Sequence, residues 1–215
     1  IKRKFSKEVD DVEGLGQMTD VIVRQTNGLR RIVDEFSKFA RMPEPELAAT
    51  DLAVLVRDAV TLQVAGQPSV TIEADLPKAG QKVDLDETMI SQALTNLIKN
   101  AGEATDTYIE KNESEDYKPK IRVKMSYENN MATITISDNG IGLPHDRARL
   151  FEPYVTTRSS GTGLGLPIVK KIIEEHGGTL SLVDAEDFDG GGHVGAMAVI
   201  NLPLGPRAPA VKSKV

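Results

Sequence analysis

The sequence of 215 residues contains no cysteine and no tryptophan, and aromatic residues make up only 4% of it. Without cysteine the chain forms no disulfide, thiolate nucleophile or cysteine-ligated zinc site, which fits a reducing compartment. No apolar run approaches the ~20 residues that span a bilayer. We therefore expect this chain to be cytoplasmic, with any anchor in the inner membrane supplied by segments before Ile1.

Clustered positive charge is also missing. The net charge is -6, and no run of lysine and arginine stands out. Neutralising a phosphate backbone needs clustered basic residues, so we expect no nucleic-acid partner. Apolar residues make up 40% and charged residues 27%, the balance of a globular chain long enough for one domain and an additional element.

The N-terminal part has the pattern of a long amphipathic helix. We expect Gly14 and Gly16 to end a first helical segment, and a helix to cover residues 17–41. Its apolar positions recur at steps of three, four and seven: Met18, Val21, Ile22, Leu29, Ile32, Val33, Phe36 and Phe39. Such a face needs a partner, either a helical hairpin paired with a second copy or the chain's own domain. Pro43 and Pro45 end the helix.

From Thr50 onward the pattern alternates between helices and strands. Helices are predicted after a cap at Thr50 or Asp51, after a cap at Asp86, and from Gly163 to His176. The predicted strands cover residues 70–75, 82–85, 121–127, 131–137, 179–184 and 195–202. The tail, residues 205–215, is rich in Pro, Ala and Lys, and we expect it to be disordered.

Two asparagines stand four residues apart on the second of these helices. Asn96 and Asn100 project from one helix face, outside the apolar stripe. An amide oxygen can ligate Mg²⁺, a hard cation that prefers oxygen. The alternative is a solvated helix face with no ligand.

A glycine-containing turn follows the hairpin. Asp138 ends a predicted strand, and Gly140 and Gly142 follow it. A carboxylate there can accept a hydrogen bond from an exocyclic amine such as that of adenine, and glycine lets backbone approach a flat ring. An ordinary Asp-Asn-Gly turn is the alternative.

A second glycine loop, residues 161–166, precedes the last predicted helix. Glycines before a helix start allow backbone N–H groups to face a phosphate, which the helix dipole also favours. The spacing matches neither a Walker A loop nor a dinucleotide fingerprint. Between the two glycine segments, Phe151 to Tyr154 places two aromatics in a polar stretch, either as an apolar anchor for a closing loop or as ordinary loop packing.

Together, in this order and spacing, the four segments resemble the N, G1, F and G2 boxes of histidine kinase catalytic domains, which share a superfamily with gyrase B and MutL. Gly190-Gly191-Gly192 resembles the family's further glycine element. The resemblance implies an α/β fold, a two-layer α/β sandwich of the Bergerat type, with helices on one face of a mixed sheet. It also implies ATP and Mg²⁺ as cofactors, bound beneath a lid over residues 139–161.

The resemblance assigns roles residue by residue. Asn100 would bind Mg²⁺, Asn96 would support the phosphates or metal, and Asp138 would contact the adenine amine. Arg158, in the lid, would reach the γ-phosphate, so Asn96 and Arg158 are the catalytic candidates. The implied nucleotide-binding set is Asn96, Asn100, Asp138, Gly140, Gly142, Thr157, Gly161, Thr162, Gly163, Leu164, Gly165 and Leu166.

The N-terminal segment adds to this resemblance. Residues 34–43 look like the end of the second dimerisation helix in NtrY-type nitrogen-regulation sensor kinases, and residues 151–157 point to the same branch. The implied organisation is a partial dimerisation region over residues 1–42, a linker over 43–49 and an ATP-binding catalytic domain over 50–204. The implied partners are a response-regulator receiver domain and a second copy through the N-terminal helices.

The three histidines do not fit the family's phosphoacceptor. His145 lies in the expected lid, His176 ends a helix where a partly positive ring suits the dipole, and His193 follows the triple glycine. We expect the acceptor to lie upstream of Ile1.

Two other functions remain open from the sequence. In hydrolases of the superfamily a Glu stands four residues before the metal-binding Asn as general base. The amide of Asn96 cannot accept a proton there, which favours phosphoryl transfer over hydrolysis. A non-catalytic, nucleotide-gated scaffold is the other alternative.

Overall fold

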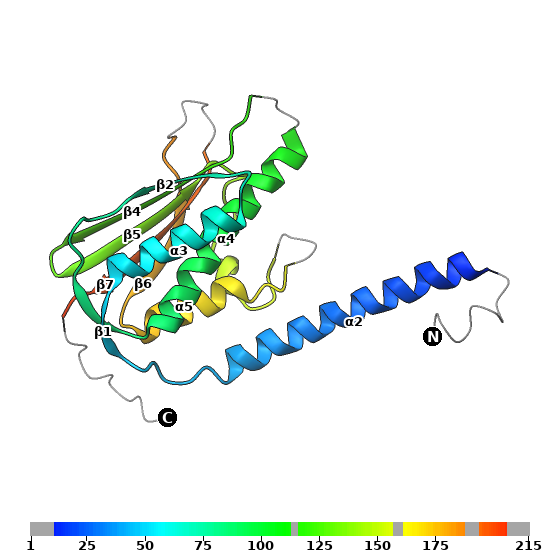
Figure 1. The fold of residues 1–215 in the computed structure, drawn as a ribbon, viewed down its shortest axis with the longest axis horizontal. Helices are drawn as coiled ribbons and strands as arrows, with labels where there is room; N and C mark the ends of the chain where they lie inside the picture. Colours follow the sequence, from blue (N-terminus) through cyan, green and yellow to red (C-terminus); the bar gives the residue numbers. More distant parts are fainter. Residues whose placement is uncertain (1–10, 113–115, 157–160, 188–193, 206–215) are drawn as a thin grey trace. The chain divides into compact units, whose positions relative to one another are not determined.

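A computed structural model describes residues 11–112, 116–156, 161–187 and 194–205 of the chain (Figure 1). The chain divides into two compact units, Ile1–Pro43 and Glu44–Val215. Each unit is described by itself. Within the described residues, no helix combines the length and apolar character needed to cross a membrane.

Within its described residues, the first unit contains one long helix, α2, from Val12 to Ala40. Asp11 caps it, because its side chain accepts a hydrogen bond of 2.7 Å from the backbone N–H of Gly14. The expectation that Gly14 and Gly16 interrupt the helix was therefore wrong. A β-carbon at Gly14 would collide with the Asp11 carboxylate, so glycine makes room for the cap.

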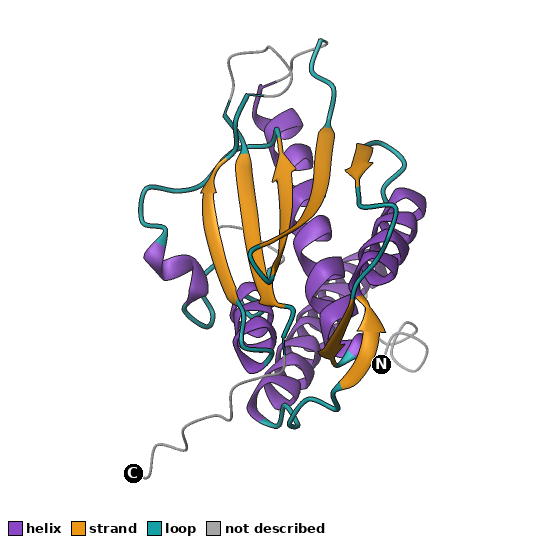
Figure 2. Cartoon of the chain, turned by 90° about the vertical axis from the view of Figure 1, so that its left-hand side faces the viewer, coloured by secondary structure: helices purple, strands orange, loops and turns teal. Residues whose placement is uncertain are grey.

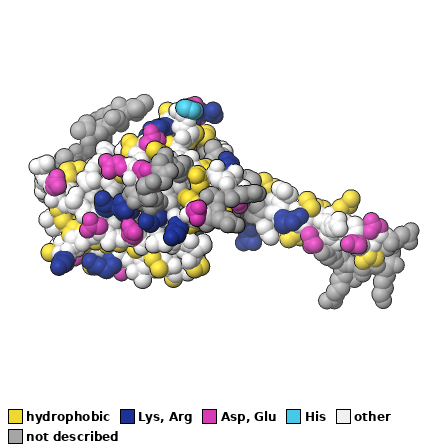
Figure 3. All heavy atoms as spheres, turned by 90° about the horizontal axis from the view of Figure 1, so that it is seen from above, with side chains coloured by type: hydrophobic (Ala, Val, Ile, Leu, Met, Phe, Trp, Pro, Cys, Tyr) yellow, Lys and Arg dark blue, Asp and Glu magenta, His cyan; other side chains and the backbone are white. Residues whose placement is uncertain are grey.

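Apolar side chains are exposed along α2, as Figure 3 shows. Met18 is 70% exposed and Leu29 is 64% exposed, and Ile22 and Val33 are similarly open. These positions repeat at helical spacing, so the helix has an apolar face. No described residue of the first unit covers this face.

The second unit contains a five-stranded mixed sheet in the order β2-β4-β5-β7-β6. Its strands are β2 (Thr71–Asp75), β4 (Lys120–Glu128), β5 (Met131–Asp138), β6 (Thr179–Asp184) and β7 (Ala196–Pro203). Only β2 and β4 pair in parallel. The hairpin between β4 and β5 turns at Asn129 and Asn130, both with positive φ, as a tight two-residue turn requires.

Three helices lie against one face of this sheet (Figure 2). They are α3 (Leu52–Gly66), α4 (Glu87–Asn112) and α5 (Gly165–Glu175). Alternate residues of the strands, including Ile121, Val123, Ile134 and Ile136, are buried beneath them. This is the predicted two-layer α/β arrangement, produced by period-two strands meeting helices with apolar stripes.

A short two-stranded sheet pairs β1 (Ala48–Asp51) with β3 (Lys82–Leu85). The sequence predicted β3 and did not predict β1. The β1 strand has four residues and no apolar alternation, so its sequence gives no strand signal, and its pairing with β3 identifies it as a strand. Asp51 also caps α3, accepting from the N–H groups of Ala53 and Val54 at 3.0 and 3.2 Å. The cap predicted there is confirmed.

Candidate functional site

The asparagine pair lies on α4, the central helix of the layer. Asn96 and Asn100 are both half-buried, while Leu97, Ile98 and Ala101 beside them are buried in the core. The two amides therefore lie outside the apolar stripe, as the sequence predicted. On the same helix the half-buried Glu103 forms an ion pair of 3.7 Å with the exposed Lys99.

Asp138 is the last residue of β5 and is only 5% exposed. Its Oδ1 accepts a hydrogen bond of 2.9 Å from the N–H of Gly140 and another of 3.3 Å from the N–H of Ala196. Two donors on one oxygen fix the plane of the carboxylate. A buried carboxylate held in one orientation is suited to accept from a donor that arrives at a defined angle.

The first glycine turn, residues 139–142, is packed against α4. A β-carbon at Gly140 would collide with the backbone of Ala104, and the N–H of Ile141 donates to the Ala104 carbonyl at 3.3 Å. Ala104 lies one turn after Asn100 on the helix. The structure thus brings the turn after Asp138 onto the same helix that carries Asn96 and Asn100.

Two further glycines allow close backbone contacts around this turn. Gly142 has φ +72°, and a β-carbon there would lie 2.9 Å from the carbonyl oxygen of Val194. Gly195 packs against the carbonyl of Asp138 so closely that any side chain would collide with it. Gly195 carries no motif of its own in the sequence. Its role depends on Asp138, which lies 57 positions earlier in the chain and meets Gly195 only once the protein has folded.

The second glycine loop leads into α5, which begins at Gly165. Gly163 has φ +69°, and a β-carbon there would lie 2.6 Å from the carbonyl carbon of Tyr154. At Gly165, by contrast, a β-carbon would meet no atom of the described residues within 4 Å. Leu164 is buried and anchors the loop at the start of this 11-residue helix.

The segment between the two glycine elements is docked by three contacts. Arg147 donates to both carboxylate oxygens of Asp184 at 2.7 Å. The 3-10 helix η1 (Ala148–Phe151) packs on α5, with Lys170 Nζ 5.1 Å from the centre of the Phe151 ring. The N–H of Tyr154, a residue with φ +67°, donates to the Gly163 carbonyl at 3.0 Å.

The described histidines differ in environment. His145 is exposed, whereas His176 is 6% exposed. Nε2 of His176 accepts from the N–H of Asp86 at 2.9 Å, so its Nδ1, 2.7 Å from the Ile172 carbonyl, carries the proton. Both ring nitrogens are thus engaged by backbone groups. His193 lies outside the described residues.

Several predicted positions also lie outside the described residues. These are Thr157 and Arg158 of the expected lid and the segment Gly190-Gly191-Gly192. The remaining predicted residues lie on α4, at the end of β5, in the first glycine turn and at the start of α5, and α5 packs against α4. The helix α4 therefore contacts the first glycine turn directly and packs against α5, which begins within the second glycine loop.

Comparison with known proteins gives one family. The profile of histidine kinase-, DNA gyrase B- and HSP90-like ATPases matches residues 85–206. The nitrogen regulation protein NtrY of Azorhizobium caulinodans is 45% identical over 192 residues, covering 88% of this chain and 24% of that protein. A putative NtrY-like sensor histidine kinase of Rickettsia typhi is 32% identical over 86% of this chain and 30% of its own length. The chain thus spans under a third of these relatives.

Solved structures agree with this grouping. The histidine kinase ThkA in complex with the response regulator TrrA superposes with a TM-score of 0.66 and 25% identity, covering 95% of this chain and 55% of that one. Full-length ShkA in complex with AMPPNP gives a TM-score of 0.65 and 25% identity, covering 89% of this chain and 39% of that one.

Proposed function

Because this chain belongs to the histidine kinase-, DNA gyrase B- and HSP90-like ATPase family, and within it to the NtrY-type sensor histidine kinases, we propose that its site binds ATP with Mg²⁺ and directs the γ-phosphate to a histidine. The chain is the ATP-binding catalytic region of such a kinase. The observation that supports the proposal is the packing of α4 against both the turn after Asp138 and α5. We infer that the asparagine pair, the Asp138 carboxylate and the start of α5 act together around this helix.

Asp138 is proposed to recognise the nucleobase. Its carboxylate is buried and held by the N–H groups of Gly140 and Ala196, so an incoming exocyclic amine meets an acceptor whose direction is already set. Gly142, with positive φ, keeps the adjoining backbone free of side chain. A hydrogen bond to a charged group contributes about 1.5–3 kcal/mol, which is enough to discriminate between bases.

Asn100 is proposed to ligate Mg²⁺, with Asn96 beside it. The described residues contain no group of three or more His, Cys, Asp or Glu placed to hold a metal. An ion here would therefore depend on the Asn100 amide oxygen together with phosphate oxygens and water, a ligand set that suits Mg²⁺. When bound, the ion supplies positive charge to the phosphates, and the chain's own task is to orient them.

The start of α5 is proposed to receive the phosphates. The loop from Gly161 to Leu166 presents N–H groups and the positive end of the helix dipole, and the space beside Gly165 is open to a ligand. Thr157 and Arg158 remain proposed contacts on the strength of the family resemblance alone.

The accepting histidine is proposed to be supplied to this domain by another segment or chain. His176 is buried with both ring nitrogens engaged, so it is not available to an in-line γ-phosphate, and His145 lies in the loop between the glycine elements and not on a helix. The exposed apolar face of α2 supports docking of a second copy, as expected for a dimerisation helix. The complex of ThkA with TrrA supports a response regulator as the onward partner.

Hydrolysis is the second candidate, and two observations disfavour it. The position occupied by Glu in the superfamily's hydrolases is Asn96 here, and an amide cannot take a proton from water. Glu103, the carboxylate on the next turn after Asn100, is paired with Lys99 at 3.7 Å.

The test has two stages. Calorimetric titration with ATP, with Mg²⁺ and then with a chelator, should show binding that weakens when the ion is removed. The protein is next incubated with γ-labelled ATP, alone and with a fragment carrying a complete histidine-bearing dimerisation hairpin whose binding has been shown. We expect no acid-labile label on this chain and label on the fragment. Absence of binding would refute the nucleotide site, and label on this chain alone would refute a supplied acceptor.

The same incubation separates the alternatives. Release of inorganic phosphate without any acceptor indicates an ATPase. Nucleotide binding with no transfer to a bound acceptor fragment indicates a scaffold.

A further inference from the structure

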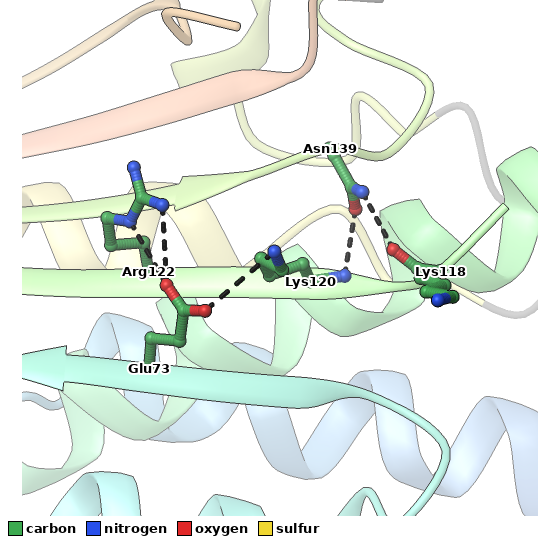
Figure 4. A network of polar contacts seen from close by, with 5 residues as sticks. All are labelled: Glu73, Lys118, Lys120, Arg122 and Asn139. Atoms are coloured by element: carbon green, nitrogen blue, oxygen red, sulfur yellow. Dashed lines mark hydrogen bonds and ion pairs between the residues drawn. The ribbon is translucent and has the colours of Figure 1, made fainter. Parts of the chain in front are cut away.

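The side chain of Asn139, the asparagine of the Asp-Asn-Gly turn, points toward Lys118 and Lys120. Asn139 is buried, and its Nδ2 donates to the Lys118 carbonyl at 2.9 Å while its Oδ1 accepts from the Lys120 N–H at 2.9 Å (Figure 4). The Tyr117 hydroxyl lies 3.0 Å from the same Oδ1 and 2.9 Å from the Asn139 carbonyl. The two ends of the amide therefore bond Lys118, just before β4, and Lys120, the first residue of β4.

This arrangement extends the sheet beyond its last regular pair. The ladder of β4 and β5 ends with Ile121 opposite Asp138, and the N–H of Asn139 still donates to the Lys120 carbonyl at 3.2 Å. Beyond this bond, the Asn139 side-chain amide forms the next two hydrogen bonds to the neighbouring chain segment, one as donor and one as acceptor, as a backbone peptide group would. Asp138 is thus held inside the ladder at the point where an unsupported strand would fray.

Tyr117 connects this turn to α4. Its ring centre lies 4.4 Å from that of Tyr108, on the last turns of the helix, at an interplanar angle of 42°. On the opposite side of the turn, Gly140 packs against Ala104 of the same helix. We define Asn139, Tyr117 and Tyr108 as the asparagine clamp. It fixes both the strand end that carries Asp138 and that end's distance from α4.

From this geometry we infer that the asparagine clamp is the positioning element for nucleobase choice, setting the orientation of Asp138 so that a purine with a 6-amino group is preferred. The inference rests on the proposed role of Asp138. A hydrogen bond to a carboxylate weakens steeply once its angle departs from linearity. A tilt of the strand end too small to unfold the protein therefore lowers the preference for the 6-amino purine. Asn139 is a positioning residue, because it acts on the ligand only through Asp138.

The required chemistry at residue 139 is narrow. An aspartate would place an oxygen against the Lys118 carbonyl, where Nδ2 now donates, and a second negative charge next to Asp138. Tyr117→Phe removes only the hydroxyl and keeps the ring stacked on Tyr108. These two changes perturb the clamp from its two sides.

The chain offers a matched control on the same sheet. Asn201, on β7, also has both ends of its amide bonded: Oδ1 accepts from Thr133 Oγ1 at 2.8 Å and Nδ2 donates to Thr179 Oγ1 at 3.4 Å. It pairs with Thr133 near the far end of β5 from Asp138. Asn201→Asp therefore introduces the same chemical change away from the clamp.

The experiment measures selectivity instead of affinity alone. ADP and the purine riboside diphosphate that lacks the 6-amino group are titrated into the wild-type protein, Asn139→Asp, Tyr117→Phe and Asn201→Asp, each shown to be folded by its melting curve. Wild type and Asn201→Asp should prefer ADP by about tenfold or more. The preference should fall to roughly twofold in Asn139→Asp and to an intermediate ratio in Tyr117→Phe.

The outcomes separate the inference from its premise. No preference for ADP in the wild-type protein refutes the adenine role of Asp138, and the inference with it. A wild-type preference that survives in both clamp variants refutes the inference and leaves the role of Asp138 standing. Loss of affinity for both nucleotides by one common factor assigns the clamp to folding and also refutes the inference. If Asn139→Asp does not fold, Tyr117→Phe decides.

Discussion

The backbone N–H of Asp86 donates a hydrogen bond of 2.9 Å to Nε2 of His176, joining the start of α4 to the end of α5. The Asp86 carboxylate meanwhile accepts from Met89 in the first turn of α4 and from Glu46 in the segment that follows the first unit, each at 3.0 Å. One residue therefore links the incoming chain to the helix that carries Asn100 and to the helix that begins at the second glycine loop.

Replacing His176 should destabilise the second unit. In His176→Phe the half-buried N–H of Asp86 loses its acceptor, which costs about 1–3 kcal/mol of unfolding free energy. Urea unfolding followed by circular dichroism measures it. His145→Phe, at an exposed position, is the control and should change the unfolding free energy by less than about 0.5 kcal/mol. Equal stability of the two variants would contradict the role of the hydrogen bond.

Asp86 should make stability depend on acid pH. Burial alone would raise the pKa of this carboxyl, but hydrogen bonds from the N–H groups of Met89, Glu46 and Thr88 outweigh it and lower the pKa below 3.8. A carboxyl whose pKa is lower in the folded protein than in the unfolded chain stabilises the folded state at pH values above the unfolded pKa. That stabilisation is lost as the pH falls through the folded pKa.

The melting temperature of wild type should therefore exceed that of Asp86→Asn at pH 7, and the gap should narrow between about pH 5 and pH 3. Asp86→Ala, which lacks any cap, should lose about 0.5–2 kcal/mol at neutral pH. A gap between wild type and Asp86→Asn that stays constant with pH would show that the charge contributes nothing.

Asp138→Asn should weaken ATP binding by roughly tenfold or more, because an amide is a poorer acceptor and presents an NH₂ group to the purine amine. Isothermal titration gives the affinity. Asp75→Asn, at the exposed end of β2, supplies the control and should bind as wild type does. Wild-type affinity in Asp138→Asn would remove the adenine assignment.

The two glycines at the start of α5 should respond differently to alanine. Gly165→Ala meets open space, so the protein should keep its stability and yet bind nucleotide more weakly, since the new methyl group occupies the place proposed for phosphate. Gly163→Ala forces a positive φ on alanine against the Tyr154 backbone and should lower both stability and binding. Unchanged nucleotide affinity in Gly165→Ala would place the phosphates elsewhere.

The docked segment between the glycine elements should close over nucleotide. Hydrogen exchange of residues 143–156 should slow when ATP and Mg²⁺ are added. Arg147→Gln, which breaks the exposed pair with Asp184, should speed exchange of this segment in the absence of nucleotide by up to about fivefold, since such a pair is worth at most about 1 kcal/mol. Arg149→Gln, whose ion pairs are longer, is the control. Identical exchange with and without ATP would contradict closure.

Much of the fold could be predicted because its signals are local. The stripe of Ile90, Leu94 and Ile98 marks one face of α4, and alternation marks β4 and β5. The start of α2 was misplaced because Gly14 and Gly16 read as breakers, whereas the side chain of Asp11 needs the room that Gly14 leaves.

The site was predicted less fully, for a different reason. Asp138 and Gly140 stand in a local motif, so their residue types alone suggest chemistry. Asn139 reads as an ordinary turn residue within that motif, and its role depends on Tyr117, 22 residues earlier in the chain. A single sequence carries no signal for such a distant partner.

The length of α4 has a mechanical consequence. With a rise of about 1.5 Å per residue, Asn100 lies about 20 Å and Tyr108 about 32 Å from the first residue of the helix, Glu87. A tilt of about 5° around that end would displace Asn100 by about 1.7 Å and Tyr108 by about 2.8 Å. A tilt of that size would thus move Asn100 by more than the tolerance of an aligned reaction.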